Sequence, residues 1–182
     1  MTPRTTRQKA GIAAAVASIA AGAEGVRQVA YYDPPGILTV CYGSTTDVQP
    51  GKVYSMDECR SRLDTDALNA VNAVERCVPG LPDNVLIAFG DAVFNLGPKI
   101  ACDKQDSTAA RMLADGSLTS ACHQLPRWNK ARIAGVLVPR PGLTKRRALE
   151  RDICLSTPPG ATVGALAPDL QGTGLFTRKV MG

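Results

Sequence analysis

The sequence predicts a mostly helical α+β protein. Its 182 residues are 45% hydrophobic and 20% charged, which is typical of a folded globular chain and not of a disordered one. Several stretches carry apolar residues three and four positions apart, the spacing of a helix face. Residues 29–43 instead mix Tyr, Val, Thr and Ile around a turn, which favours short strands. A small sheet near the N-terminus, followed by helices, is therefore expected.

The N-terminal segment resembles an export signal. Arg4, Arg7 and Lys9 precede residues 10–23, which are uncharged and apolar on all faces. Ala21–Ala23 also fits a signal-peptidase site. Such a run forms about 21 Å of helix, less than the roughly 30 Å hydrocarbon layer. A membrane anchor and a soluble alanine-rich helix both remain open.

The elements that follow are a pair of strands and a series of helices. The strands flank a turn at Asp33–Gly36, and Ser55 with Glu58 forms a capping box that starts a helix ending near Ala73. Further helices are expected at 84–96, 106–115, 117–128 and 143–155, with an apolar loop at 133–141. Residues 156–182 are rich in Pro, Gly and Thr and predict a loosely ordered tail.

Charge and histidine content restrict the possible functions. The net charge of +5 favours anionic partners such as acidic lipids or cell-wall polymers. Nucleic-acid binding fits poorly, since aromatic residues are few and no groove-reading motif is present. The single histidine, His123, excludes a zinc site built from several histidines.

Six widely spaced cysteines favour disulfide bonds in an oxidising compartment. None forms a Cys-x-x-Cys pair, which speaks against a structural metal site. Six buried thiols in a reducing cell are the alternative. Sequence alone allows fifteen complete pairings. The positions are Cys41, Cys59, Cys77, Cys102, Cys122 and Cys154.

Two carboxylates and a threonine form the candidate catalytic set. Glu24 ends the apolar segment, Asp33 follows nine residues later in a turn, and Thr39 lies in the second strand. Burial at an apolar helix end favours the protonated form of Glu24, and the helix dipole acts in the same direction. Asp33 in a polar turn is expected to stay ionised. One protonated and one ionised carboxylate suit glycoside hydrolysis, although such spacing is common by chance.

The chain resembles phage-type lysozymes, glycoside hydrolase family 24, in several motifs that occur in the family's order. The first motif places Glu24, Tyr31, Asp33 and Thr39 in the family's frame together with Gly25, Gly36, Cys41 and Gly43. Three later segments, 89–97, 127–129 and 142–151, also match. Together these motifs span about 24–155.

This resemblance implies a fold and a mechanism. The fold is phage-lysozyme-like, with a small N-terminal β-sheet lobe and a C-terminal helical lobe joined by a long helix. Residues 1–23 form an anchor-like segment and partly the first helix, 24–155 form the catalytic domain, and 156–182 form the tail. Glu24 is the general acid, while Asp33 activates a water that Thr39 positions. The enzyme inverts the anomeric centre of the peptidoglycan substrate and needs no metal or cofactor.

The resemblance also implies the disulfides Cys41–Cys59, Cys77–Cys102 and Cys122–Cys154. The expectations for several other residues come from the sequence itself. Trp128 is expected in the core, and His123 on a helix surface. The basic residues Lys145, Arg146, Arg147 and Arg151 predict a solvated helix face. Gly90 and Asp91 are expected to loosen the helix that contains them.

The predicted function is a monomeric phage endolysin that hydrolyses peptidoglycan for host lysis. Residues 10–23 would hold it in the inner membrane before release to the periplasm, and storage in the host cytoplasm until a holin acts is the alternative. Two other functions compete with this prediction. One is a membrane-anchored, lysozyme-like binding or regulatory protein without turnover, and the other is a chitinase on a related fold.

Overall fold

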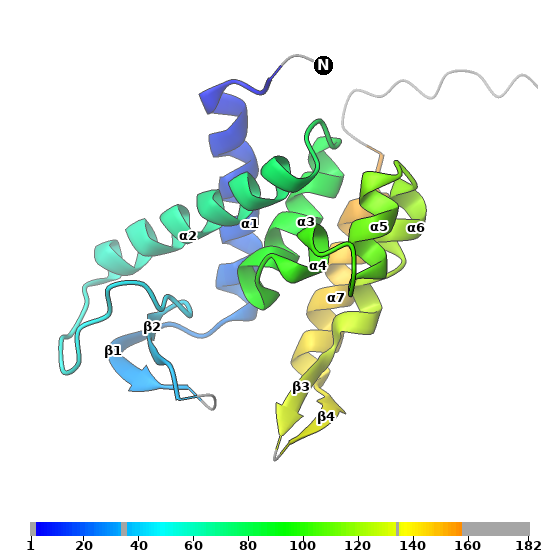
Figure 1. Cartoon of the computed structure of the whole chain (residues 1–182). Helices are drawn as coiled ribbons and strands as arrows, with labels where there is room; N and C mark the ends of the chain where they lie inside the picture. The colour runs from blue at the N-terminus through cyan, green and yellow to red at the C-terminus, as the bar shows by residue number, and fades with distance from the viewer. Residues whose placement is uncertain (1–2, 34–35, 134, 158–182) are drawn as a thin grey trace, which may run out of the picture.

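The computed structural model describes residues 3–33, 36–133 and 135–157. Helices dominate it, with a small antiparallel sheet at one end and a hairpin beside the last helix (Figure 1). The predicted mostly helical α+β class is confirmed. The elements are α1 (Thr6–Ala23), β1 (Arg27–Tyr32), β2 (Leu38–Cys41), α2 (Met56–Cys77), α3 (Asp83–Leu96), α4 (Lys99–Cys102), α5 (Thr108–Ala114), α6 (Leu118–Cys122), the 3₁₀ turn η1 (Leu125–Trp128), β3 (Lys130–Ile133), β4 (Val136–Pro139) and α7 (Pro141–Leu155).

Helix α1 is part of the core and not an appendage. A capping box between Thr5 and Gln8 starts it, so the helix begins earlier than the apolar run. One face packs on α2 and α3, and the residues buried there are Ile12, Ala13, Val16, Ala17 and Ala20. Small alanine side chains let the helices approach closely. No helix in the described ranges is long and apolar enough to cross a bilayer.

Helix α2 is the long connection between the two lobes. It has 22 residues, or about 33 Å, and runs from the small sheet to the helical lobe (Figure 1). The predicted capping box of Ser55 and Glu58 is present. The helix continues past the expected end at Ala73, because the fully buried Val74 extends its apolar face to Cys77.

Helix α3 is the centre of the helical lobe and packs against α1, α2 and α7. The expectation that Gly90 and Asp91 loosen it is wrong. A Cβ at Gly90 would lie 3.0 Å from Val16 Cγ2 and 3.3 Å from Val71 Cγ2, so glycine permits close packing. Asp91 is fully buried and accepts two hydrogen bonds from Arg146.

The C-terminal half departs from the sequence prediction in two places. The helix expected at 117–128 is interrupted between α6 and η1, because Pro126 has no N–H to donate to the carbonyl four residues earlier. The segment expected as an apolar loop at 133–141 is instead strand β4, paired with β3, and the start of α7. Val and Ile favour strands, and Gly135 takes the positive φ of 85° at the turn.

Three disulfides join the segments that the family resemblance predicted. Cys41–Cys59 links β2 to α2, Cys77–Cys102 links α2 to α4, and Cys122–Cys154 links α6 to α7. Each bond closes a loop of 18 to 32 residues. Cross-links of this kind restrict the unfolded chain and so stabilise the native one.

Candidate active site

Glu24 lies where α1 ends, and three elements position its carboxylate. Its backbone N–H closes the helix on the carbonyl of Ala20 at 2.9 Å. Glu24 Oε1 accepts hydrogen bonds from Arg146 Nη1 on α7 at 2.6 Å and from Asn95 Nδ2 on α3 at 3.4 Å. The side chain is 36% exposed, so water and substrate can reach it.

Asp33 and Thr39 lie on one hairpin and share a backbone anchor. Strands β1 and β2 pair antiparallel with Tyr31 opposite Thr39. Asp33 Oδ1 accepts the backbone N–H of Ile37 at 2.7 Å, while Thr39 Oγ1 donates to the Ile37 carbonyl at 3.0 Å. Because the Thr39 hydroxyl donates its hydrogen bond to that carbonyl, the lone pairs of its oxygen remain able to accept a hydrogen bond from a water.

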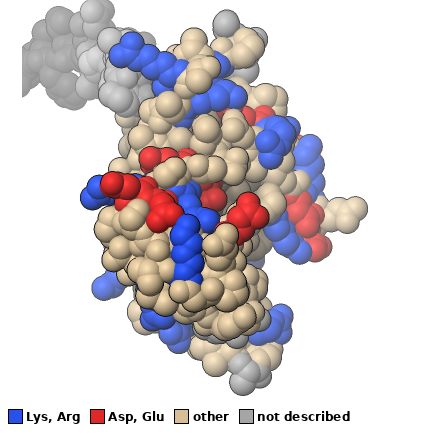
Figure 2. All heavy atoms as spheres, turned by 90° about the vertical axis from the view of Figure 1, so that its left-hand side faces the viewer, with Lys and Arg blue, Asp and Glu red and all other residues tan. Residues whose placement is uncertain are grey.

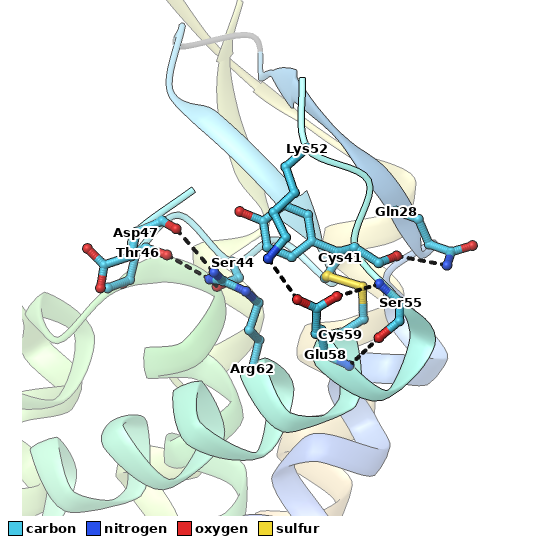
Figure 3. The surroundings of a disulfide bond; sticks show 11 residues. Gln28, Cys41, Ser44, Thr46, Asp47, Lys52, Ser55, Glu58, Cys59 and Arg62 are labelled. Atoms are coloured by element: carbon cyan, nitrogen blue, oxygen red, sulfur yellow. Dashed lines mark hydrogen bonds and ion pairs between the residues drawn. A yellow bond between two sulfur atoms is a disulfide. The ribbon is translucent and has the colours of Figure 1, made fainter. Parts of the chain in front are cut away.

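A disulfide and several polar contacts hold this hairpin on α2 (Figure 3). Cys41 adopts a positive φ of 59°, which turns β2 sharply before its sulfur reaches Cys59. Arg62 on α2 donates to the carbonyls of Thr46 and Asp47, which fixes the loop after the strand. The small sheet is therefore tied to the long helix at two points.

Glu24 contacts a network of charged side chains that are otherwise buried in the protein. We call Glu24, Asp91, Arg146, Arg147 and Glu150 the carboxylate–guanidinium network. Arg146 binds both oxygens of Asp91 at 2.8 Å through Nε and Nη2, and its Nη1 reaches Glu24. Such a fork-to-fork pair fixes the guanidinium plane. Arg146 is 5% exposed, and Asp91, Arg147 and Glu150 are fully buried.

The network contradicts the predicted solvated face for Arg146 and Arg147. Both side chains point into the protein from α7, and Arg147 pairs with Glu150 one turn later. Burial lowers the pKa of Arg146, but the contacts with Asp91 and the charges of Glu24 and Glu150 together outweigh it and raise the pKa, so this guanidinium stays charged. Burial raises the pKa of Glu150, and the neighbouring Asp91 adds to the rise against the opposing effect of Arg147.

For Glu24, the sequence indicated only burial and the helix dipole, both of which favour the protonated acid. The structure adds Arg146, whose Nη1 lies 2.6 Å from Glu24 Oε1. One signal was available: Asp91 lies on the apolar face of a helix, and a charge in that position needs a buried partner.

His123 and Trp128 are the other residues singled out from the sequence. His123 is exposed at the end of α6, and Trp128 packs against the main core as predicted. Within the described residues, no group of three His, Cys, Asp or Glu side chains is placed to hold a metal ion.

A cavity of about 280 Å³ opens between the small sheet and the helical lobe. Its walls come from the loop after β2, from α2 and from the end of α3, including Gly43, Thr45, Asp66, Asn69 and Phe94. Burial raises the pKa of Asp66, although a hydrogen bond from Ser44 and the charge of Arg62 oppose the rise. Phe94 also lies 5.8 Å from the guanidinium of Arg146, so the cavity adjoins the charged network.

Comparison with known proteins identifies the family. Residues 21–150 match the phage lysozyme family, a span that includes Glu24, Asp33, Thr39 and the charged part of α7. The chain belongs to the phage lysozyme family. This phage lysozyme is 38% identical to a SAR-endolysin of bacteriophage PS119, over 74% of its own length and 77% of the relative. It is 34% identical to a SAR-endolysin of enterobacteria phage P21, with 74% and 78% coverage.

Solved structures agree with the family assignment. The muramidase domain of SpmX from Asticaccaulis excentricus superposes with a TM-score of 0.69 at 27% identity, covering 79% of this phage lysozyme and 96% of that domain. The active form of P1 phage endolysin Lyz gives a TM-score of 0.65 at 26% identity, with 78% and 83% coverage. The phage-lysozyme-like fold is confirmed, and the chain is a phage endolysin that hydrolyses peptidoglycan.

Proposed function

We propose that this endolysin is an inverting muramidase that cleaves the β-1,4 bond between N-acetylmuramic acid and N-acetylglucosamine. The observation that carries the proposal is the placement of Glu24. Its carboxylate is held by side chains from α3 and α7 at the end of α1. The chain continues directly into the hairpin that contains Asp33 and Thr39.

In the proposed reaction Glu24 protonates the glycosidic oxygen as the bond to the anomeric carbon breaks. Arg146 stabilises the carboxylate that forms when the proton leaves, because its charge is fixed 2.6 Å from Oε1. Asp91 keeps Arg146 in that position through two hydrogen bonds. Arg146 and Asp91 are positioning residues, whereas Glu24 contacts the reacting atoms.

Asp33 accepts a proton from a water that attacks the anomeric carbon from the opposite face. The Ile37 N–H fixes the orientation of the Asp33 carboxylate, and the free lone pairs of Thr39 Oγ1 accept from the same water. An inverting enzyme requires about 6.5–9.5 Å between the two carboxylates, which leaves room for this water. The cavity beside Phe94 provides space for a neighbouring sugar ring.

The test combines two variants with product analysis. Glu24→Gln and Asp33→Asn are expected to lose about 10²–10⁴-fold in cell-wall hydrolysis while keeping their unfolding temperature. The first product of the parent enzyme on peptidoglycan is expected to be an α-anomer with muramic acid at the new reducing end, as read by NMR. A β-anomer, or turnover by Glu24→Gln within tenfold of the parent, would exclude the mechanism. If the parent protein shows no turnover, a binding protein would be favoured. If it prefers chitin oligomers to cell wall, a chitinase would be favoured.

We also propose that α1 has a second location, in the host inner membrane before release into the periplasm. The SAR-endolysin names of several relatives and the uncharged run at 10–23 support this location. In the membrane Arg4, Arg7 and Lys9 would stay on the cytoplasmic side. Glu24 would then lack its partners on α3 and α7, so the anchored enzyme would be inactive. Fractionation of host cells before lysis tests this directly, since an entirely cytosolic enzyme would contradict it.

A further inference from the structure

The β3–β4 hairpin extends away from the helical lobe (Figure 1). Four consecutive residue pairs lie opposite one another without a bulge, from Lys130 opposite Pro139 to Ile133 opposite Val136. Its base is fixed, because Arg140 N–H donates to the Asn129 carbonyl at 2.9 Å. Strand geometry and a fixed base make the hairpin an ordered projection.

The hairpin carries aliphatic side chains into solvent. Val136 is 63% exposed and Leu137 55% exposed, and Ile133 and Val138 are also exposed. No residue of β4 is buried, in contrast with β2, where three of four residues are. Ile133, Val136 and Val138 share one face of the hairpin, and Leu137 lies on the other face beside Arg132, so exposed aliphatic side chains occur on both faces. Exposed aliphatic side chains clustered in this way are typical of a surface that another molecule covers.

Basic side chains accompany these aliphatic residues without acidic ones. Lys130, Arg132 and Arg140 are exposed along the hairpin, and the sequence contains no Asp or Glu from 116 to 149. In the described ranges none of the three forms a salt bridge, and Arg132 donates to the Gly135 carbonyl. The face drawn in Figure 2 differs, because acidic and basic side chains adjoin one another there.

We propose that the β3–β4 hairpin is a docking surface for an anionic phospholipid bilayer. Aliphatic side chains flanked by Lys and Arg suit the boundary between lipid headgroups and acyl chains. The cations bind phosphates, while Val136 and Leu137 leave water for hydrocarbon. Peptidoglycan also carries anionic groups, but its sugars and peptides offer little hydrocarbon to cover such side chains.

The expected binding is weak, reversible and sensitive to salt. Each basic residue near an anionic surface strengthens binding about fivefold, so Arg132 and Arg140 together account for about 25-fold. Salt screens this attraction within about 8 Å at physiological ionic strength. The hairpin would therefore keep the folded enzyme near a membrane without anchoring it.

Vesicle binding by the full-length chain tests the proposal. The protein is expected to co-sediment with vesicles of phosphatidylglycerol and phosphatidylethanolamine, and at least tenfold less with phosphatidylcholine alone. Val136→Thr with Leu137→Thr keeps the β propensity but removes hydrocarbon, and it should weaken binding at least fivefold. Arg132→Gln with Arg140→Gln should weaken binding about 25-fold at low salt. Leu68→Gln with Leu149→Gln removes exposed leucines from α2 and α7 and should leave binding unchanged.

Two outcomes would overturn the proposal. Equal vesicle binding by the parent and both hairpin variants would assign any membrane affinity to another segment, such as α1. Loss of binding to purified cell-wall sacculi with no loss of vesicle binding would assign the hairpin to the substrate. Hydrolysis of soluble peptidoglycan fragments by the hairpin variants is measured in parallel, so a failure of the catalytic proposal is seen separately.

Discussion

Arg146 is shared between the buried carboxylate of Asp91 and the partly exposed carboxylate of Glu24, the proposed general acid. Asp91 holds two of its nitrogens, which leaves Nη1 for Glu24. A lysine in its place would supply charge without the planar fork that makes both contacts at once. The position of the Glu24 carboxylate therefore depends on Arg146, whose side chain is only 3% exposed.

Asp91→Asn is expected to destabilise the protein and to lower activity. Asparagine keeps the shape of the side chain but leaves Arg146 with less negative charge in a buried site. Breaking a buried charge pair costs about 3–5 kcal/mol, which urea unfolding would measure. Asp152→Asn on α7 is the control, because its pair with Arg151 is exposed and contributes about 0–1 kcal/mol. Equal stability of Asp91→Asn and the parent would contradict this account.

At the scale of elements, the close contact between α1 and α3 depends on Gly90, which has no side chain. Gly90→Ala adds a Cβ 3.0 Å from Val16 Cγ2, within a core that has little room to adjust. Overpacking costs about 1–3 kcal/mol, whereas the better helix propensity of alanine returns about 1 kcal/mol. A net loss of stability is therefore expected in thermal unfolding.

A double-mutant cycle separates the two contributions at Gly90. Val16→Ala removes the methyl group that the new Cβ would meet, so Gly90→Ala should cost less in that background. If Gly90→Ala stabilises the parent protein, α1 and α3 are not packed as closely as the structure has them.

The N-terminal ion-pair cluster, formed by Arg4, Lys9, Glu75 and Asp83, holds the other end of α1. Glu75 is 14% exposed and contacts Arg4 at 3.0 Å and Lys9 at 2.6 Å. Burial alone would raise the pKa of Glu75, but the hydrogen bonds from Lys9 and Arg4 outweigh it and lower the pKa. Arg4 and Lys9, which would stay on the cytoplasmic side in an anchored protein, thus form ion pairs with Glu75 on α2 in the folded protein.

Glu75→Gln is expected to destabilise the protein by about 1 kcal/mol at neutral pH. Because the folded pKa is lowered, the stabilisation by Glu75 is complete above the unfolded pKa of about 4.5 and is lost as pH falls through the folded pKa. The stability curves of parent and variant should therefore converge below pH 4.5. A difference that persists unchanged at pH 3 would show that the charge of Glu75 is not its cause.

At the scale of the whole molecule, the sequence predicted the helical framework and the family resemblance predicted the disulfide pairs, but neither predicted the charged interior. Period and capping signals located α2 and α3 to within a few residues, because these signals are local. The partners of Arg146 lie far away in the sequence, on α3 and at the end of α1, so helix periodicity could not reveal them. The β3–β4 pair was missed for a similar reason, since a short apolar run is ambiguous without its neighbour.

Helix α1 has to satisfy two environments if the anchor proposal holds, and its two faces allow these demands to be tested separately. Ala17 is buried against the helical lobe, so a leucine there would damage the folded enzyme as well as deepen an anchor. Gly11, Ala14 and Ser18 are exposed, and a Cβ at Gly11 meets nothing within 4 Å. Leucine at these three positions should therefore leave the folded protein active.

The triple variant Gly11→Leu, Ala14→Leu and Ser18→Leu is expected to remain in the membrane fraction and to delay lysis. Each leucine favours insertion by up to about 0.6 kcal/mol, so release becomes less favourable while the buried face of α1 is unchanged. Host-cell fractionation and lysis timing measure retention, and hydrolysis by detergent-extracted, refolded protein measures intrinsic activity. Glutamine at the same three positions is the control and should shorten membrane retention. Normal lysis timing with the leucine variant in the soluble fraction would show that α1 acts only as the first helix of the folded enzyme.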